Sequence, residues 1–596
     1  MVLELIDWVI IGLFFVISIG IGIFVSKKAG KNTSEFFLSG RSMPWWLLGV
    51  SMVATTFSAD TPNLVADIVR NNGVSGNWVW WAFLLTGMLT VFLYAKLWRR
   101  SKVLTDLEFY ELRYSGKEAA FLRGFRAVYL GFFFNIVIMA TVSLAAIKIS
   151  GVLLGLSPIQ TLLIASVVTV IYSSLGGLKG VLITDFFQFF IAMIGSVWAT
   201  MVIIDIPEVG GLQNLLTHEN VKDKLDILPD FSDTEMLITL FIIPIAVQWW
   251  SVWYPGAEPG GGGYIAQRML SAKDEKNAVW ATLLFNVVHY AIRPWPWILI
   301  ALASLIVFPE LSDLAKAFPN LDASVVKDDL SYPAMLTYLP SGLLGLVLTS
   351  LVAAFMSTIS THLNWGSSYM INDFYQRFFR PKATSKELVL AARVSTVLLM
   401  FFAAVLALFL SSALQAFNIL LKIGAGTGLL FILRWFWYRI NAWSEITAMI
   451  VSFVLALYFQ LIHTRIGFIE IPASLQLIIG IFITTIAWVS VTLLTKPSND
   501  ETLELFYRKI RPGGPGWKKI ENKISIEEKG YNKDSEEWDV PVAILCMVVG
   551  SFMVFSMLFT IGYFIYGNYK LCIITSFLLV LSLYVLMKLW KKLRMN

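Results

Sequence analysis

The sequence predicts an all-α polytopic membrane protein, and three observations support this fold class. Of its 596 residues, 57% are hydrophobic and 14% are charged, whereas soluble domains are roughly 45–50% apolar. The hydrophobic residues form many runs that are each long enough to cross a bilayer. Two of these runs are interrupted by residues that a helix does not tolerate. The net charge of +6 does not indicate a nucleic-acid partner. In a membrane protein, basic residues are interpreted by the side of the membrane on which they lie.

In chain order, the apolar runs predict about fifteen membrane-spanning helices. The first run follows Glu4 and Asp7 and precedes Lys27 and Lys28, which favours a retained helix with its N-terminus outside. The runs lie near 7–26, 44–70, 76–98, 121–150, 157–174, 180–205, 234–254, 277–308, 332–374, 386–411, 413–438, 441–463, 470–495, 541–566 and 570–590.

An odd number of helices then places the C-terminus in the cytoplasm, as expected for a multi-pass protein of the plasma (inner) membrane. The distribution of basic residues agrees, because most of them fall in predicted inside loops, as the positive-inside rule requires. The predicted inside segments hold Arg99, Arg100, Arg123, Arg126, Arg268, Arg377, Arg380, Arg434, Lys588, Lys591 and Lys592, among others.

Two runs are broken in mid-membrane. The second run contains Asp60 and Pro62, and the seventh ends in WWSVWYPGAEPGGGGYIAQR at 249–268. Proline kinks are common in membrane helices, and the glycine stretch could be only a loop. However, the breaks begin two consecutive five-helix blocks, 44–205 and 234–438, which is typical of an inverted-repeat transporter with its site at the breaks.

The remaining segments flank these two blocks. They are an N-terminal extra helix and inside loop at 1–43, an outside loop at 206–233, additional helices at 439–495, a cytoplasmic linker at 496–540, and a C-terminal helix pair with a basic tail at 541–596. The predicted fold is therefore an inverted five-plus-five helix repeat with one extra N-terminal and about four extra C-terminal transmembrane helices.

The stretch LVAAFMSTISTHLN at 351–364 carries a cluster of hydroxyls inside an apolar run. Ala354, Ser357 and Thr358 share one helical face, and Ser357, Ser360 and Thr361 repeat the spacing one turn later. Such uncharged oxygen ligands suit a weakly held monovalent cation such as sodium. Alternatively, these small residues serve only to let membrane helices pack closely.

With these features, the chain resembles the sodium:solute symporter family, and in particular its sodium/glucose cotransporter-like members, over approximately residues 7–495. The resemblance implies a leucine-transporter-like fold. It rests on the hydroxyl helix, on FFLSGRSMPWW (36–46), on Gly176, Gly177, Thr184, Asp185 and Gln188, on QRMLSAKD (267–274), and on NDFY (372–375).

The resemblance implies two sodium sites. The first would use backbone carbonyls at Ala54 and Phe57, together with Ala354, Ser357 and Thr358 on the hydroxyl helix. The second would use Asp185, Ser357, Ser360 and Thr361. For Asp185, an alternative is a solvated pair with Lys179 at the cytoplasmic end, although ionisable residues within a membrane are usually functional.

The sequence-derived candidates for substrate binding lie at the breaks and in the eighth run. They are Asp60, Trp250, Trp253, Tyr254, His289, Tyr290 and Arg293. The aromatic residues could stack on a ring or form an interfacial belt. Asp60 could tune cation affinity, contact substrate or cap a half-helix. Arg293 could pair with Asp60 or receive an anionic group.

These patterns predict a sodium-coupled secondary symporter that imports a small polar organic solute by alternating access, with a sugar or related compound favoured. The expected partners are this solute, sodium ions and the lipid bilayer, with no obligate protein partner evident. The alternative function is a solute sensor that retains the symporter fold without net transport. An enzyme is not indicated, because the sequence offers no nucleophile–base constellation, metal spacing or nucleotide loop.

Overall fold

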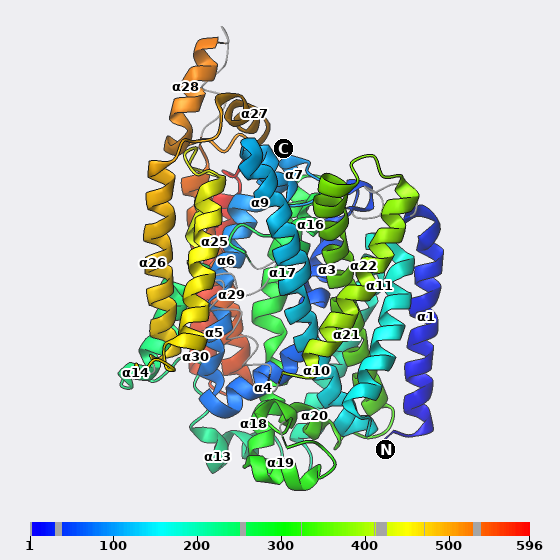
Figure 1. Ribbon diagram of the computed structural model, residues 1–596. Coiled ribbons are helices and arrows are strands. Elements are labelled where there is room, and N and C mark those ends of the chain that lie inside the picture. The colour runs from blue at the N-terminus through cyan, green and yellow to red at the C-terminus, as the bar shows by residue number, and fades with distance from the viewer. Residues whose placement is uncertain are drawn as a thin grey trace.

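In the part of the chain that it describes, the computed structural model consists of helices joined by turns and loops and contains no strand. The described residues are 3–29, 38–250, 258–323, 325–410, 412, 426–469, 471–527 and 538–595. Figure 1 shows the long helices side by side in one bundle, with the N-terminus at one end and the C-terminus at the other. The helices α27 (Asp500–Ile510) and α28 (Lys518–Glu527) lie at the C-terminal end, so the linker and the tail share one end of the bundle.

Within the described residues, nine helices are long and apolar enough to cross a membrane. Shorter apolar helices account for most of the other expected runs, and the first half of the run at 413–438 lies outside the described residues. The prediction of a multi-pass membrane protein is therefore confirmed. The nine helical stretches are Val74–Ser101, Gly116–Leu154, Leu178–Ile204, Glu275–Val307, Leu343–Phe379, Ser385–Ala407, Ala473–Leu494, Val540–Ile565 and Tyr569–Trp590.

The expected runs at 157–174 and 180–205 both lie in one helical element, α11 (Pro158–Ile204). Its 47 residues greatly exceed the approximately 20 that a single crossing needs. The element begins with a capping box, in which the Ser157 hydroxyl accepts from the Gln160 amide and the Gln160 side chain accepts from the Ser157 amide. It packs against α1 (Leu5–Ala29) and against the two helices that carry the candidate ion site.

The first expected break is present. Helix α3 (Trp45–Thr56) ends before Phe57, and α4 (Asp60–Asn72) begins three residues later. Pro62 occupies the first turn of α4, where its missing N–H would have no intrahelical acceptor in any case. The proline therefore starts the second half-helix, and the break itself lies just before it.

The second break is present in the residues that the structure describes. Helix α15 (Ile243–Ala246) gives way to a short 3-10 turn at Gln248–Trp250, and residues 258–262 before α16 (Gly263–Ser271) are not helical. Gly260 and Gly261 adopt φ angles of 90° and 80°, which only glycine adopts readily. The Pro255 end of the expected break lies outside the described residues.

Two long elements complete the core. Helix α21 (Leu343–Ser368) carries the hydroxyl cluster, and nearly all of its residues are buried. Helices α17 (Glu275–Val287) and α18 (Pro294–Val307) are joined through a π-helical turn at Val288–Ile292, so the eighth expected run is continuous. The other large helices are α9 (Gly116–Val128), α10 (Asn135–Leu154), α22 (Ser385–Ala407), α25 (Ala442–Leu457), α26 (Ala473–Leu494), α29 (Val540–Ile565) and α30 (Tyr569–Trp590).

Buried ion pairs join segments that are distant in the sequence. Lys148 Nζ of α10 lies 2.5 Å from Asp329 Oδ1, and both side chains are almost completely buried. Arg126 of α9 pairs with Glu258 beside the second break, with nitrogen and oxygen 2.5 Å apart. Breaking such a pair leaves an uncompensated charge in a low-dielectric environment.

We therefore expect Lys148→Met to destabilise the protein by about 3–5 kcal/mol, because the buried Asp329 carboxyl loses its ion-pair partner. The measurement is thermal unfolding of the detergent-solubilised chain. The matched control is Lys148→Met combined with Asp329→Leu, which removes both charges and should recover much of the lost stability. A single variant as stable as the unmodified chain would contradict this assignment.

Candidate functional site

The hydroxyl cluster of α21 faces the interior of the bundle. Ala354, Ser357 and Thr358 are each less than 5% exposed, so this face of the helix does not contact lipid. It packs against α3, which ends at the first break, and against α11, which carries Asp185. Polar atoms buried in this way need partners within the protein or from a bound ion.

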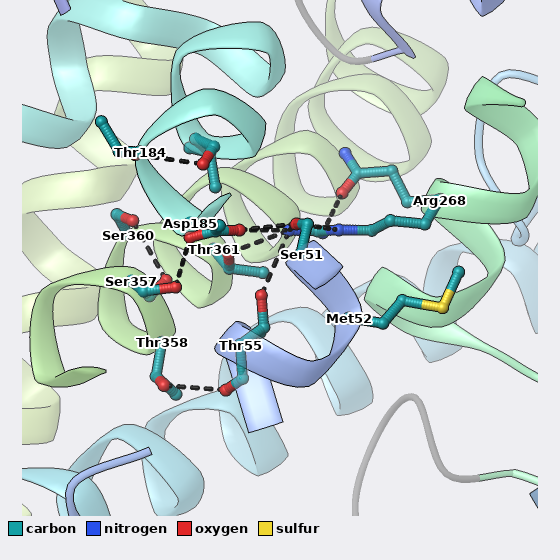
Figure 2. Close-up of polar contacts among 12 residues, drawn as sticks. Ser51, Met52, Thr55, Thr184, Asp185, Arg268, Ser357, Thr358, Ser360 and Thr361 are labelled. Atoms are coloured by element: carbon teal, nitrogen blue, oxygen red, sulfur yellow. Dashed lines mark hydrogen bonds and ion pairs between the residues drawn. The ribbon is translucent and has the colours of Figure 1, made fainter. Parts of the chain in front are cut away.

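The broken helix and the hydroxyl helix are joined by a direct hydrogen bond. The Thr358 hydroxyl donates to the backbone carbonyl of Thr55, 2.9 Å away, in the last turn of α3 (Figure 2). In the same turn the Ala54 carbonyl accepts from the Phe57 amide at 3.1 Å, where the helix ends. Hydroxyl and carbonyl oxygens thus lie together beside the break, and this oxygen-rich environment suits a sodium ion.

Asp185 lies at the centre of a second polar group. Its side chain is fully buried, so the alternative of a solvated pair with Lys179 is wrong. The carboxylate accepts hydrogen bonds from the Ser51 hydroxyl at 2.5 Å and from the Ser357 hydroxyl at 2.6 Å (Figure 2). The Ser360 hydroxyl instead donates to the Ser357 carbonyl at 3.1 Å.

Arg268 was expected in an inside loop, and that prediction is wrong. The side chain is fully buried and extends from α16 to the Asp185 group (Figure 2). Its guanidinium donates to the hydroxyls of Ser51, Thr55 and Thr361 at 3.2–3.4 Å, and one nitrogen lies 3.9 Å from the Asp185 carboxylate. Burial of the charge is possible because a carboxylate and three hydroxyls compensate it.

A cavity of about 90 Å³ lies beside the first break. Thr55 and Thr358 line it, so the oxygens that join α3 and α21 also border the space that a solute would occupy. The cavity has both polar and apolar walls. Its remaining lining residues are Thr56, Ser58, Asp60, Thr61, Leu64, Val65, Trp80, Ile138, Thr141, Val142, Tyr264, His289, Arg293 and His362.

The structure brings three of the seven candidate substrate residues to this cavity: Asp60, His289 and Arg293. Tyr290 lies outside the lining and stacks on Trp80, with ring centroids 5.9 Å apart.

Trp250 lies elsewhere, packed against the apolar cluster that Ile243 of α15 forms with Leu477 and Ile481 of α26. Trp253 and Tyr254 lie outside the described residues.

Arg293 and Asp60 both line the cavity without pairing with each other. A guanidinium nitrogen of Arg293 donates to the Thr56 hydroxyl at 3.3 Å, and the guanidinium carbon lies 5.1 Å from the centroid of the Trp297 ring. The Arg293 Nε, the Asp60 Oδ1 and the His289 Nδ1 atoms are buried and have no hydrogen-bond partner in the protein. Unpartnered buried groups that border a cavity indicate a polar ligand.

Sequence reasoning missed several residues of this site. Ser51 and Thr55 lie on α3 before the break, and nothing in their spacing distinguishes them from packing residues. Arg268 had a usable signal, because a lone arginine follows the glycines of the second break by only five residues. The helix that begins there, α16, is buried along its whole length, and Arg268 is buried with it.

A broken helix that meets a buried hydroxyl helix, with a polar cavity beside the break, is the arrangement in which secondary transporters hold solute and coupling ion. The sequence model of the sodium:solute symporter family matches residues 36–452, and the chain belongs to this family. Its members are transporters rather than enzymes, and they use Na⁺ as the coupling ion.

Curated relatives and a solved structure support this placement. The sodium/glucose cotransporter of Vibrio parahaemolyticus is 24% identical over 84% of this chain and 92% of that protein. The sodium/sialic acid symporter SiaT of Proteus mirabilis is 24% identical over 73% of this chain and 86% of that protein. A solved structure of a Na⁺-coupled sialic acid symporter in a substrate-bound outward-open state matches with a TM-score of 0.65 and 21% identity. The match covers 83% of this chain and 99% of that chain, and it shows the shared fold.

We expect Ser357→Ala to raise the apparent Kd for sodium at least about tenfold, which is roughly 1.4 kcal/mol. The hydroxyl is an expected ligand of both candidate sites, and it donates a hydrogen bond to Asp185. The measurement is the sodium-dependent rise in melting temperature, with potassium as the reference cation.

The matched control is Ser350→Ala on the same helix, whose hydroxyl bonds only within its own helix, to the Val347 carbonyl. Unchanged sodium dependence in the Ser357→Ala variant would remove this residue from the ion site.

Proposed function

We propose that this chain is a sodium-coupled symporter that imports a small polar organic solute by alternating access. One observation supports this proposal most strongly. Thr55 and Thr358 form the hydrogen bond that joins α3 to α21, and both residues also line the cavity. Sodium held by Ala54, Phe57, Ala354, Ser357 and Thr358 would fix the end of the broken helix, and thereby one wall of the solute cavity.

The free energy of sodium entry can drive accumulation. A single charge that crosses 100 mV releases about 2.3 kcal/mol, which is about a fiftyfold gradient of a neutral solute at 1.4 kcal/mol per decade. The proposed setting is the plasma (inner) membrane, with the N-terminus outside and the C-terminus in the cytoplasm. In this orientation α27 and α28 are cytoplasmic and the cavity receives solute from outside.

The charges of the cavity define the chemistry of the solute. Arg293 requires an acceptor or an anionic group, and Asp60 requires a donor or a cationic group. A sugar or related compound with hydroxyl, amino or carboxyl groups meets both requirements. The names of the relatives, which include glucose and sialic acid transporters, support this class.

A solute sensor is the second candidate function. The linker helices dock firmly on the membrane bundle, since the Trp517 indole N–H donates to the Trp435 carbonyl at 2.9 Å. Arg113 lies over the Phe506 and Trp517 rings at 5.4 and 5.0 Å. Such contacts could report the state of the bundle to the cytoplasm, and net uptake separates a transporter from a sensor.

The decisive experiment is uptake by proteoliposomes that contain the purified chain. Sugars, sugar acids and amino sugars are first screened for sodium-dependent thermal stabilisation, and each stabilising solute is then tested for uptake. We expect accumulation above the external concentration with an inward sodium gradient and none with potassium. Sodium-dependent binding without accumulation would favour the sensor.

We expect Arg293→Gln to weaken solute binding by about 1.5–3 kcal/mol, because it removes a charged hydrogen-bond donor from the cavity. The measurement is the Kd of the stabilising solute at saturating sodium. Trp250→Phe is the matched control, because this side chain packs on α26 away from the cavity. Equal loss in both variants would show that the effect is not specific to the cavity.

A further inference from the structure

The second candidate sodium site already contains a positive group that belongs to the protein. Arg268 approaches the Asp185 carboxylate to 3.9 Å, and its guanidinium donates to Thr361, one of the oxygens expected to bind the second ion, at 3.2 Å. Both charged side chains are fully buried. The guanidinium is therefore among the oxygens that a second sodium would use (Figure 2).

The hydrogen bonds of this group are mutually consistent. Ser51 donates its proton to Asp185 at 2.5 Å and accepts from Arg268 at 3.3 Å, so it links the carboxylate to the guanidinium. The other carboxylate oxygen accepts from Ser357 at 2.6 Å. A sodium ion at this position would have to displace donors that already satisfy the carboxylate.

The charge balance of Asp185 and Arg268 also argues against a second sodium ion at this position. One carboxylate and one guanidinium sum to zero, and a buried neutral pair does not attract a further cation as an isolated carboxylate would. The nearest positive neighbour of an added sodium ion would be the guanidinium, in an environment that screens poorly. The site is thus built for one positive charge, and Arg268 supplies it.

We propose that Arg268 takes the place of the second sodium ion, so that the chain binds and transports a single sodium ion in each cycle. This inference rests on the proposed symport function and fixes its stoichiometry. It replaces the expectation that Asp185, Ser360 and Thr361 hold a second ion, and it leaves the first site unchanged.

Arg268 also connects the charge pair with the remaining sodium site and with the solute cavity. Its guanidinium donates to the Thr55 hydroxyl at 3.4 Å, and the carbonyl of the same residue accepts from Thr358. The guanidinium carbon lies 5.6 Å from the centroid of the Tyr264 ring, which lines the cavity. Arg268 is therefore a positioning residue that holds α3, α11, α16 and α21 together at the ion site.

The test is equilibrium binding of radioactive sodium to the purified full-length chain. We expect the unmodified chain to saturate at one sodium ion per chain with a Hill coefficient near one. Saturation at two ions per chain would overturn the inference while leaving sodium coupling intact. Absence of any saturable sodium binding would instead contradict the proposed function, sodium-coupled symport, on which the inference depends.

Variants of Arg268 test whether this residue replaces an ion or only stabilises the structure. Arg268→Gln frees the Asp185 carboxylate, and we expect this variant to bind two sodium ions per chain. Combining Arg268→Gln with Asp185→Asn removes both charges, and binding should return to one ion. A folded Arg268→Gln variant that still binds one ion would contradict the inference.

Arg268→Lys keeps the charge and should also bind one ion, which controls for loss of the guanidinium shape. If Arg268→Gln does not fold, the ion count of the unmodified chain alone decides.

Discussion

A helix that breaks inside a membrane leaves backbone carbonyls without intrahelical donors, and this constraint organises the whole site. At the end of α3, the α21 hydroxyl of Thr358 supplies one donor to the Thr55 carbonyl. A sodium ion is the natural partner for the other oxygens, because it can accept several uncharged ligands at once. In the proposed mechanism, the broken helix leaves oxygens that a cation can bind, and the hydroxyl helix places further oxygens beside them.

Much of the fold could be predicted because it follows from hydrophobic length and from helix-breaking residues. The breaks at Phe57–Ala59 and at Gly260 have local causes in proline and glycine, which act on their own backbone. Helical spacing placed Ser357 and Thr358 on one face of their helix, and the structure buries that face. Features that depend on one sequence position and its immediate neighbours were therefore accessible without coordinates.

The missed features depend on contacts between distant segments. The positive-inside rule assigned Arg268 to a loop, because it counts charges near apolar runs and ignores half-helices that return into the bundle. Trp250 is next to a break in the sequence, yet its ring packs against α26, more than two hundred residues later. No periodicity within either segment specifies these partners, since tertiary packing decides which face of a short helix is central.

The Asp185–Arg268 pair also determines which charges respond to the membrane voltage. The buried pair of carboxylate and guanidinium carries no net charge. The membrane voltage therefore contributes little free energy when the pair moves with the bundle in the proposed transport cycle. The mobile ion at the adjacent site then carries the charge that crosses the membrane, in addition to any charge on the solute. Arg268 is part of the protein and is not transported, so it supplies no free energy from the sodium gradient. The carrier therefore reaches a lower accumulation of solute than it would with a second sodium ion. In return, Arg268 keeps Asp185 compensated throughout the cycle, including the steps in which no sodium is bound.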